Sequence, residues 1–414
     1  MRSVGGLGRF RFPVAVGAVL AVAIAAAAAY LAIATQAGPG AHAAADRAQA
    51  AVNRAARAAA TGNAHATASG NGQPDGTAST QAAAPALAQY GNPDGGAVVP
   101  KAARAVSTAH PNHVIGDGTP ASCTSAAVVK AVAEGGVITF NCGPSPVTIT
   151  MTATAKVVNT SRRIVLDGGG LVTLSGGGKH RILYMNTCDP KQIYTTSDCW
   201  EQKWPQLIVQ NLKFVHAYSG VKETATSSYG GGAIFDEGGQ LKVVNSDFVD
   251  NSCYKTGPDL GGAAIRALGM WQGSPVYITS DTFRGGRCSN GGALSSIDAS
   301  WSVYDSLFSE NKTTGWGENP QASGTPGGGS GGAIYTDGDN YNVLIDGTII
   351  HYCYAGRGEG GAVFFVVDAG RGVLTIEDST LHHNPAGGYQ NLPGIFSDVD
   401  QAVTAPVVIH STIN

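Results

Sequence analysis

Two pairs of acidic residues are the nearest candidates for the two carboxyl groups that sugar hydrolysis needs. Asp236 adjoins Glu237, and Asp337 lies two residues before Asp339. Hydrolysis of a sugar chain needs two carboxyl groups that face each other across the bond to be broken. Both pairs fall in turns beside glycine, where acidic residues also occur for structural reasons. We therefore expect structural turns here, with a catalytic pair as the alternative.

Metal ligands could come from two places in the chain. The segment 337–340, Asp-Gly-Asp-Asn, offers oxygen atoms to calcium but lacks the remaining ligands of a known calcium loop. His382 and His383 are neighbours, and neighbouring residues of a strand point to opposite faces, so they make a poor pair for one ion. The sequence lacks the CxxC spacing that is typical of zinc sites. We expect no cofactor, with calcium at 337–340 as the alternative.

A column of large side chains could bind a sugar chain. The first strand of each repeat ends at the same position, occupied in turn by Phe235, Arg266, Ser295, Tyr335 and Phe364. If the column faces solvent, sugar rings can stack along it; if it faces inward, it is simply core. Arg266 favours the outward orientation, because a buried charge without a partner is costly.

Glycine-rich loops carry two further aromatic residues, Trp271 and Trp316. Long loops on a solenoid often carry function, although each ring could also fold back over the coil beneath it. The candidate binding residues are Phe235, Asp236, Arg266, Tyr335, Asp337, Asp339, Phe364 and Trp316.

The elements that position these residues repeat along the last two hundred positions. A polar residue, two spacers and a large apolar residue recur seven times, and a GGA phrase followed by an apolar residue recurs between them. Two linked signatures with a period near 33 residues indicate a solenoid built from equivalent coils. The large apolar residues are Phe214, Phe248, Phe283, Phe308, Ile349, Leu381 and Ile413.

Each repeat has the pattern strand, turn, strand, turn. In one repeat Leu241 and Val243 face the same way, and Val276 with Ile278 continue their column. Strands this short bury enough apolar surface only when coil stacks on coil as parallel strands. The polar residues three places before each apolar marker tolerate tight turns and should form a ladder: Asn211, Asn245, Ser280, Asp305, Asp346, Asp378 and His410.

The two ends of the solenoid need protection. Residues 123–136 predict a capping helix that starts at Thr124 or Ser125 and ends at Gly135. No cap is evident at the other end, so either residues 387–396 or a partner covers the last coil.

Seven cysteines predict three disulfides in an exported domain. Cys253 and Cys288 each lie five residues after their own marker, so they should stack in adjacent coils about 4.8 Å apart, within reach of a disulfide. Cys123 with Cys142 and Cys188 with Cys199 bracket short units of the chain. Cys353 remains a free thiol in this prediction, and isolated buried thiols are the alternative for each pair.

The N-terminus predicts export. Three arginines precede an uncharged apolar run from Phe12 to Thr35, long enough to span a bilayer. Residues 1–35 are therefore a retained membrane anchor or a cleaved signal peptide, and the remainder is extracellular in either case. Residues 36–107 contain few large apolar residues and predict a flexible linker. The net charge of −3 indicates no nucleic-acid partner.

The motifs resemble those of a known family. GGAI at 231–234, combined with FxxN at 248–251 and 308–311, resembles the repeat of the polymorphic outer-membrane-protein family. The opening segment 123–142 is similar to the N-terminal cap of bacterial β-helix proteins with a pectin-lyase-like fold. The resemblance covers roughly residues 107–414 and implies surface adhesion, and for that fold also polysaccharide lyases and hydrolases. The repeats at Phe283 and Ile349 depart from FxxN, and the lyase motif RxPxxR and the hydrolase motifs NTD, DD and GHG are missing.

Together these observations predict an all-β protein, a single-stranded right-handed parallel β-helix of eight or nine coils over residues 108–414. We expect a secreted or membrane-anchored cell-surface protein that binds polysaccharide without catalysis. A carbohydrate-active enzyme, a lyase more than a hydrolase, is the alternative, and a structural stalk without ligand is the third possibility.

Overall fold

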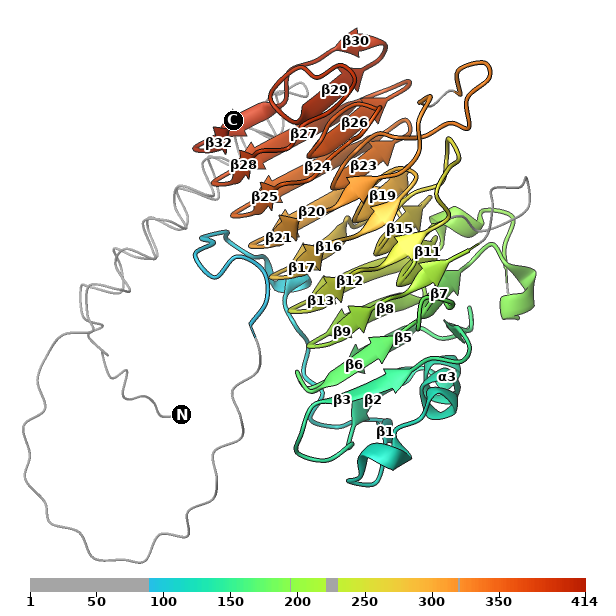
Figure 1. The fold of residues 1–414 in the computed structure, drawn as a ribbon. Coiled ribbons are helices and arrows are strands. Elements are labelled where there is room, and N and C mark those ends of the chain that lie inside the picture. The colour runs from blue at the N-terminus through green and yellow to red at the C-terminus, as the bar shows by residue number, and fades with distance from the viewer. Residues whose placement is uncertain (1–88, 194, 221–229, 319–320) are drawn as a thin grey trace, which may run out of the picture. The chain divides into compact units, whose positions relative to one another are not determined.

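Strands of successive repeats lie side by side and parallel, so that the repeats stack as coils of a β-solenoid (Figure 1). The structure is a computed structural model and describes residues 89–193, 195–220, 230–318 and 321–414. The predicted anchor or signal segment 1–35 and most of the predicted linker lie outside these residues. Within them, three long sheets and one short sheet run along the solenoid.

Sheet A has ten strands, one or two more than the eight or nine predicted coils. Its strands are β1 (His113–Ile115), β2 (Gly136–Phe140), β5 (Arg163–Asp167), β8 (Gln206–Gln210), β12 (Gln240–Val244), β16 (Val276–Thr279), β20 (Trp301–Tyr304), β24 (Tyr341–Asp346), β27 (Gly372–Glu377) and β31 (Val407–Ile409). The predicted inward columns are confirmed, because Leu241, Val243 and Ile278 belong to the main hydrophobic core.

Sheet B follows sheet A in each coil and carries the large apolar markers. Its strands are β3 (Val147–Thr150), β6 (Val172–Ser175), β9 (Lys213–Val215), β13 (Asp247–Val249), β17 (Thr282–Arg284), β21 (Leu307–Ser309), β25 (Ile349–His351), β28 (Thr380–His382) and β32 (Thr412–Ile413). Phe214, Phe248, Phe283 and Phe308 stack with 4.8 Å between successive ring centroids. Each such contact adds about 0.5–1.5 kcal/mol to the burial of its area.

One marker was assigned wrongly from the sequence. Phe308 pairs with Ile350 rather than Ile349, and Ile350 in turn pairs with Leu381. Strand alternation then turns Ile349 outward, and Ile350 is the fully buried residue. The left-handed turn position of this coil is consequently Gly347, with φ 62°, and not Asp346. At the other six predicted ladder positions the polar residue itself has a positive φ.

Sheet C begins each coil and holds the predicted aromatic column. Its strands are β4 (Ala155–Lys156), β7 (Leu183–Asn186), β11 (Ile234–Glu237), β15 (Ile265–Leu268), β19 (Leu294–Ile297), β23 (Ile334–Asp337), β26 (Val363–Val367), β29 (Ile395–Val399) and the antiparallel β30 (Ala402–Val403). Residues 387–396 therefore do not merely cover the last coil, because Ile395 and Phe396 extend the sheet by one more strand.

Sheet D is short and lies where the long loops leave the coils. Its strands are β10 (Tyr218–Ser219), β14 (Ser252–Cys253), β18 (Arg287–Cys288) and β22 (Lys312–Thr313). The predicted disulfide between Cys253 and Cys288 joins two of these coils with a Cα–Cα distance of 4.8 Å. The structure also joins Cys123 to Cys142 and Cys188 to Cys199, and Cys353 is a buried free thiol.

Short helices occupy the start of the solenoid and one insertion. The predicted capping helix is α3 (Ser125–Glu134), where Thr124 accepts a hydrogen bond from the backbone of Ala127 and Gly135 ends the helix with φ 76°. Val128 and Val132 of α3 join the main core at the first coils. Four 3-10 helices complete the set: η1 (Lys101–Ala103), η2 (Pro120–Ser122), η3 (Pro190–Gln192) and η4 (Cys199–Glu201).

The predicted linker 36–107 is too long at its C-terminal end. Residues 89–107 lie on the outer side of sheet A as a strap, drawn in blue in Figure 1. Ala97 and Ala103 of the strap pack with Tyr304 in a small apolar cluster of their own. The sequence did not predict this ordered segment, because backbone groups, and not large apolar side chains, make most of its contacts.

Candidate functional site

A cleft of about 500 Å³ opens on the outer face of sheet C at the last three coils. Ile334, Val363 and Ile395 point into the core, so the residues that follow each of them point outward. These outward positions build the floor of the cleft, and a loop and the adjoining turns build its sides. The lining residues are Asp337, Glu359, Phe364, Val366, Val367, Asp368, Phe396, Asp398 and Gln401.

Two stacked aromatic rings, Phe364 and Phe396, line the cleft, and the buried ring of Tyr335 continues the stack in the preceding coil. Tyr335 and Phe364 are parallel, with 4.8 Å between ring centroids and 1° between planes. Phe364 and Phe396 stack at 5.1 Å and 17°. Tyr335 and Phe364 are buried, whereas Phe396 is half-buried and the neighbouring Tyr389 is 56% exposed. An incoming ligand would therefore meet the face or edge of Phe396 first.

Asp337 is held rigidly at the centre of the cleft. The Tyr335 hydroxyl donates to its Oδ2 at 2.7 Å, and the backbone N–H of Gly338 donates to its Oδ1 at 2.9 Å. Burial raises the pKa of Asp337 to about 6, against the effect of the Tyr335 hydrogen bond, and the nearby charge of Asp368 adds to the increase. At neutral pH this carboxyl group is thus mostly ionised, and it takes up a proton as the pH falls through about 6.

Two more carboxyl groups of the cleft have raised pKa values. Burial, with the charges of Glu318 and Asp398, raises the pKa of Glu359 to about 7. Burial also raises the pKa of Asp368, together with the charges of Asp339 and Asp298, while hydrogen bonding to Asp337 acts in the opposite direction. A carboxyl group that keeps its proton can donate a hydrogen bond, so the cleft offers both donors and acceptors to sugar hydroxyls.

The predicted column of outer residues is present, but all five of its members are buried. Phe235 pairs with Arg266 and Arg266 with Ser295, as predicted, and all three are fully buried. The guanidinium of Arg181 lies 4.9 Å from the Phe235 ring centroid and covers it. Arg266 donates to Ser295 Oγ and to the Asp259 carbonyl, so the loop before β15 covers it in turn. The prediction of a solvent-exposed strip is therefore wrong at these coils, because loops cover the column.

Asp236 is not a surface residue. It pairs with Met185 and Ala267, which both belong to the main core, so its side chain points into the solenoid while Glu237 points out. These two acids lie on opposite faces and cannot act together on one substrate. Burial, followed by the charge of Glu237, raises the pKa of Asp236 well above its usual range.

The second predicted acid pair is also divided. Asp337 lines the main cleft, whereas Asp339 lines a smaller hollow of about 190 Å³ with Trp200 and Asp298. The backbone N–H of Asp339 donates to Asp298 Oδ1 at 2.8 Å, which ties this turn to the preceding coil. Trp316 lies in its loop with 36% of its surface exposed, and the Arg357 guanidinium covers its ring at 5.2 Å.

Seven of the nine lining residues were missed in the sequence analysis, among them Glu359, Asp368, Phe396 and Asp398. A signal existed for one of them, because Gly394-Ile395-Phe396 repeats the glycine, apolar, aromatic order of the earlier strands. Asp398 follows two residues later on the same face. Glu359 and Asp368 lie in a loop and a turn, whose positions depend on the coil they flank.

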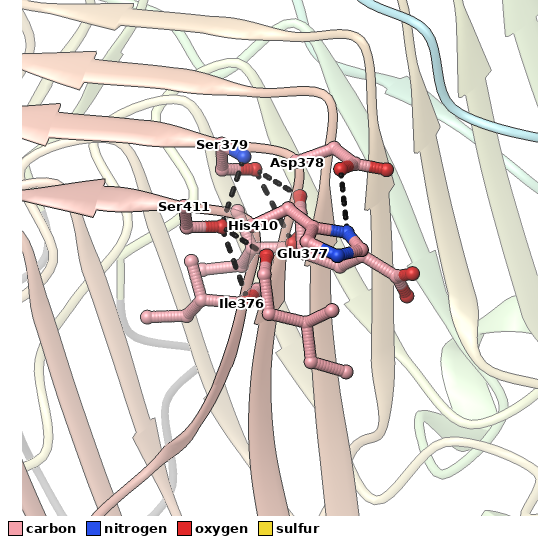
Figure 2. Close-up of polar contacts among 8 residues, drawn as sticks. Ile376, Glu377, Asp378, Ser379, His410 and Ser411 are labelled. Carbon is pink, nitrogen blue, oxygen red and sulfur yellow. Dashed lines mark hydrogen bonds and ion pairs between the residues drawn. The ribbon is translucent and has the colours of Figure 1, made fainter.

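A histidine, an aspartate and two serines also meet at the last two coils, as Figure 2 shows. His410 Nδ1 lies 3.4 Å from Asp378 Oδ1, but among the described residues the histidine ring makes no hydrogen bond to either serine. Ser411 donates to the Ile409 carbonyl and accepts from the backbone N–H of Ser379 at 3.0 Å. The serines thus belong to a ladder that ties coil to coil.

That ladder extends over six coils. Each hydroxyl or carboxyl accepts a hydrogen bond from the backbone of the preceding coil, beginning with Asp281 Oδ1, which accepts from Ser246 N–H at 2.7 Å. The other acceptors are Ser306, Thr348, Ser379 and Ser411. It stabilises the stack without forming a site.

Among the residues that the structure describes, no group of three or more His, Cys, Asp or Glu side chains is arranged to hold a metal ion. Nor does any helix in the described ranges combine the length and apolar character needed to cross a membrane.

No protein-family model, curated protein or solved structure matches this chain. The resemblance to the polymorphic outer-membrane-protein family therefore depends on the motifs alone, and the architecture depends on the stacked parallel sheets.

Proposed function

We propose that this protein is an exported β-helix that binds an extended polysaccharide in the cleft over β23, β26 and β29. The observation that supports this most is the combination of a stacked aromatic floor with carboxyl groups around it. The half-buried ring of Phe396 provides an apolar contact for a sugar ring, and carboxyl groups bond the sugar hydroxyls. An extended solenoid face also suits an extended chain.

Charge narrows the class of polysaccharide. Asp337, Glu359, Asp368 and Asp398 line the cleft, and its described lining includes no Lys, Arg or His. Such a surface repels polymers of uronic acids and accepts neutral or amine-bearing sugars. The same composition argues against a lyase, because a lyase needs a base near its acidic substrate.

The wider setting of the proposal is a right-handed β-helix at the cell surface, with a pectin-lyase-like architecture. Parallel strands connected within one structure almost always wind right-handed. Three disulfides fit an oxidising compartment outside the cytoplasm. Residues 1–35 would supply either the secretion signal or the membrane anchor.

Binding can be tested with the purified full chain on a panel of neutral, amine-bearing and uronate polysaccharides. We expect Phe396→Ala to weaken binding by about tenfold, which corresponds to the loss of roughly one stacking contact. Tyr354→Ala removes an exposed aromatic residue outside the cleft and should leave affinity unchanged. Equal affinity of Phe396→Ala and the unchanged chain, or no binding to any polymer, would refute the proposal.

Hydrolysis is a second candidate, which the neighbouring Asp337 and Asp368 favour. One carboxyl group with a raised pKa could act as an acid while its partner stays ionised. Incubation of the full chain with the bound polysaccharide should then release new reducing ends, and Asp337→Asn should abolish their release. Binding without new reducing ends would leave adhesion as the function.

A further inference from the structure

The second position after the sheet B marker bends the chain in six successive coils, from β9 to β28. Gly285 has φ 69° there, and the other five residues have φ between 48° and 58°: His216, Asp250, Glu310, Tyr352 and His383. The left-handed backbone at this point ends the strand, so its side chain no longer alternates with the preceding one. Any inference from simple strand alternation fails here.

This bend brings two histidine rings together that the sequence had placed on opposite faces. His382 ends β28, and His383 follows it with φ 55°. Their Nδ1 atoms lie 2.8 Å apart and share a hydrogen bond, an interaction that a bound metal ion would replace. His382 is half-buried and His383 is exposed, so both rings are accessible from solvent.

Further aromatic residues from the preceding coil support the pair. His351 pairs with His382 in the strand register, and their ring centroids lie 5.2 Å apart. Tyr352 stacks on His383 at 5.3 Å with 23° between the planes. These contacts limit how the two histidine side chains can rotate, which lowers the entropic cost of fixing them on a ligand.

The separation of the two nitrogen atoms identifies the kind of ion that would fit. With metal–nitrogen bonds of about 2.0–2.1 Å, a gap of 2.8 Å between Nδ1 atoms gives an angle at the metal of about 84–89°. Square-planar and tetragonal Cu²⁺ requires neighbouring ligands at about 90°. Tetrahedral Zn²⁺ would need the nitrogen atoms about 3.3–3.4 Å apart.

We propose that His382 and His383 form a two-nitrogen chelating site for Cu²⁺ on the outer face of sheet B. The described residues supply no third side chain in a ligating arrangement, so water completes the coordination. Glu310 in the neighbouring coil is exposed and lies near His351, which adds negative potential on this side. Copper is also the divalent first-row ion that nitrogen ligands bind most tightly.

The test uses the purified full chain without a histidine tag, titrated with Cu²⁺ and followed by electron paramagnetic resonance and calorimetry. We expect one copper ion per chain with a tetragonal spectrum and nitrogen coupling. His382→Gln and His383→Asn should each weaken binding by about tenfold or more, because a single imidazole cannot chelate. Asparagine tolerates the left-handed backbone of residue 383, so that variant should keep its fold.

His410→Ala is the matched control, because His410 is an exposed histidine of the next coil, paired with Asp378. Its copper affinity should equal that of the unchanged chain. Wild-type affinity in both His382→Gln and His383→Asn, or an equal loss in His410→Ala, would overturn the proposal. Zn²⁺ affinity as high as Cu²⁺ affinity would overturn the assignment of the ion.

Discussion

Asp236 places a carboxyl group inside the solenoid, where its side chain has no exposed surface. Among the described residues neither of its oxygen atoms accepts a hydrogen bond of good geometry, and the effect of the nearby Glu237 backbone on its pKa is smaller than that of burial. An ionised carboxylate without a partner is strongly unfavourable in such surroundings, so the group keeps its proton in the folded state. Ala267 in the next coil is small, which gives the carboxyl group room without giving it a partner.

Asp236→Asn should therefore stabilise the protein at pH 8. The folded pKa of Asp236 is raised, so above its unfolded value the unfolded chain releases a proton that the folded chain retains. The free energy of unfolding thus falls as the pH rises above about 4, and Asn, which does not ionise, removes this loss. We expect a melting temperature about 2–4 °C higher, measured by calorimetry.

The pH dependence of that gain is its main control. The difference between Asp236→Asn and the unchanged chain should shrink as the pH is lowered towards 4, where both states of the unchanged chain are protonated. Asp339→Asn alters an exposed acid and should change the melting temperature little. A destabilised Asp236→Asn at pH 8 would show that the carboxyl group has a stabilising partner.

At the scale of the strand and turn, the FxxN motif has a direct structural explanation. The Asn311 side chain accepts from Gly286 N–H at 2.9 Å and donates to the Phe283 carbonyl at 2.9 Å, both in the preceding coil. Asn251 and Asn384 bond their preceding coils in the same way. Asparagine occupies this position in alternate coils, and the repeats at Phe283 and Ile350 are the coils in between.

Asn311→Ala should lower the free energy of unfolding by about 2–4 kcal/mol, because it leaves a buried N–H and a buried carbonyl without partners. Denaturant unfolding of the purified chain measures this directly. Asn340→Ala is the matched control, because its side chain is exposed and accepts only from the Arg371 backbone in an exposed contact. Similar midpoints for the two variants would contradict the role of the ladder.

The sequence predicted the strands and turns well wherever one residue type recurred at equivalent positions. The Phe column, the inward pairs of sheet A and the disulfide between Cys253 and Cys288 follow from repeat spacing alone, because stacking forces equivalent positions together. Ile349 was misassigned because two adjacent isoleucines fit the pattern equally well. The cleft was predicted only through Asp337 and Phe364, since loops that differ between coils determine which outer positions stay open.

At the scale of the whole molecule, the strap of residues 89–107 links coils that are far apart along the solenoid. Tyr90 N–H donates to Asn245, Ala97 N–H donates to Asp305 at 2.9 Å, and Val106 N–H donates to Gln210. Lys242 Nζ donates to the carbonyls of Ala102 and Arg104. No sequence period could predict this path, because the strap occurs once and bonds mainly through its backbone.

Asp305 is the strongest attachment near the start of the strap, and its replacement tests whether the strap is held segment by segment. Besides accepting from Ala97, Asp305 accepts from Asn92 N–H through its own carbonyl at 2.7 Å. Asp305→Ala removes the side-chain bond and leaves the backbone bond.

Hydrogen exchange measured by mass spectrometry should then become faster in peptides covering residues 91–99. Peptides covering 104–108 should keep their protection, because Gln210 still bonds Val106 through both its amide oxygen and its amide nitrogen. Asp339→Ala should change neither group of peptides. Faster exchange along the entire strap in Asp305→Ala would contradict this expectation, because it would mean that the strap detaches as one cooperative unit.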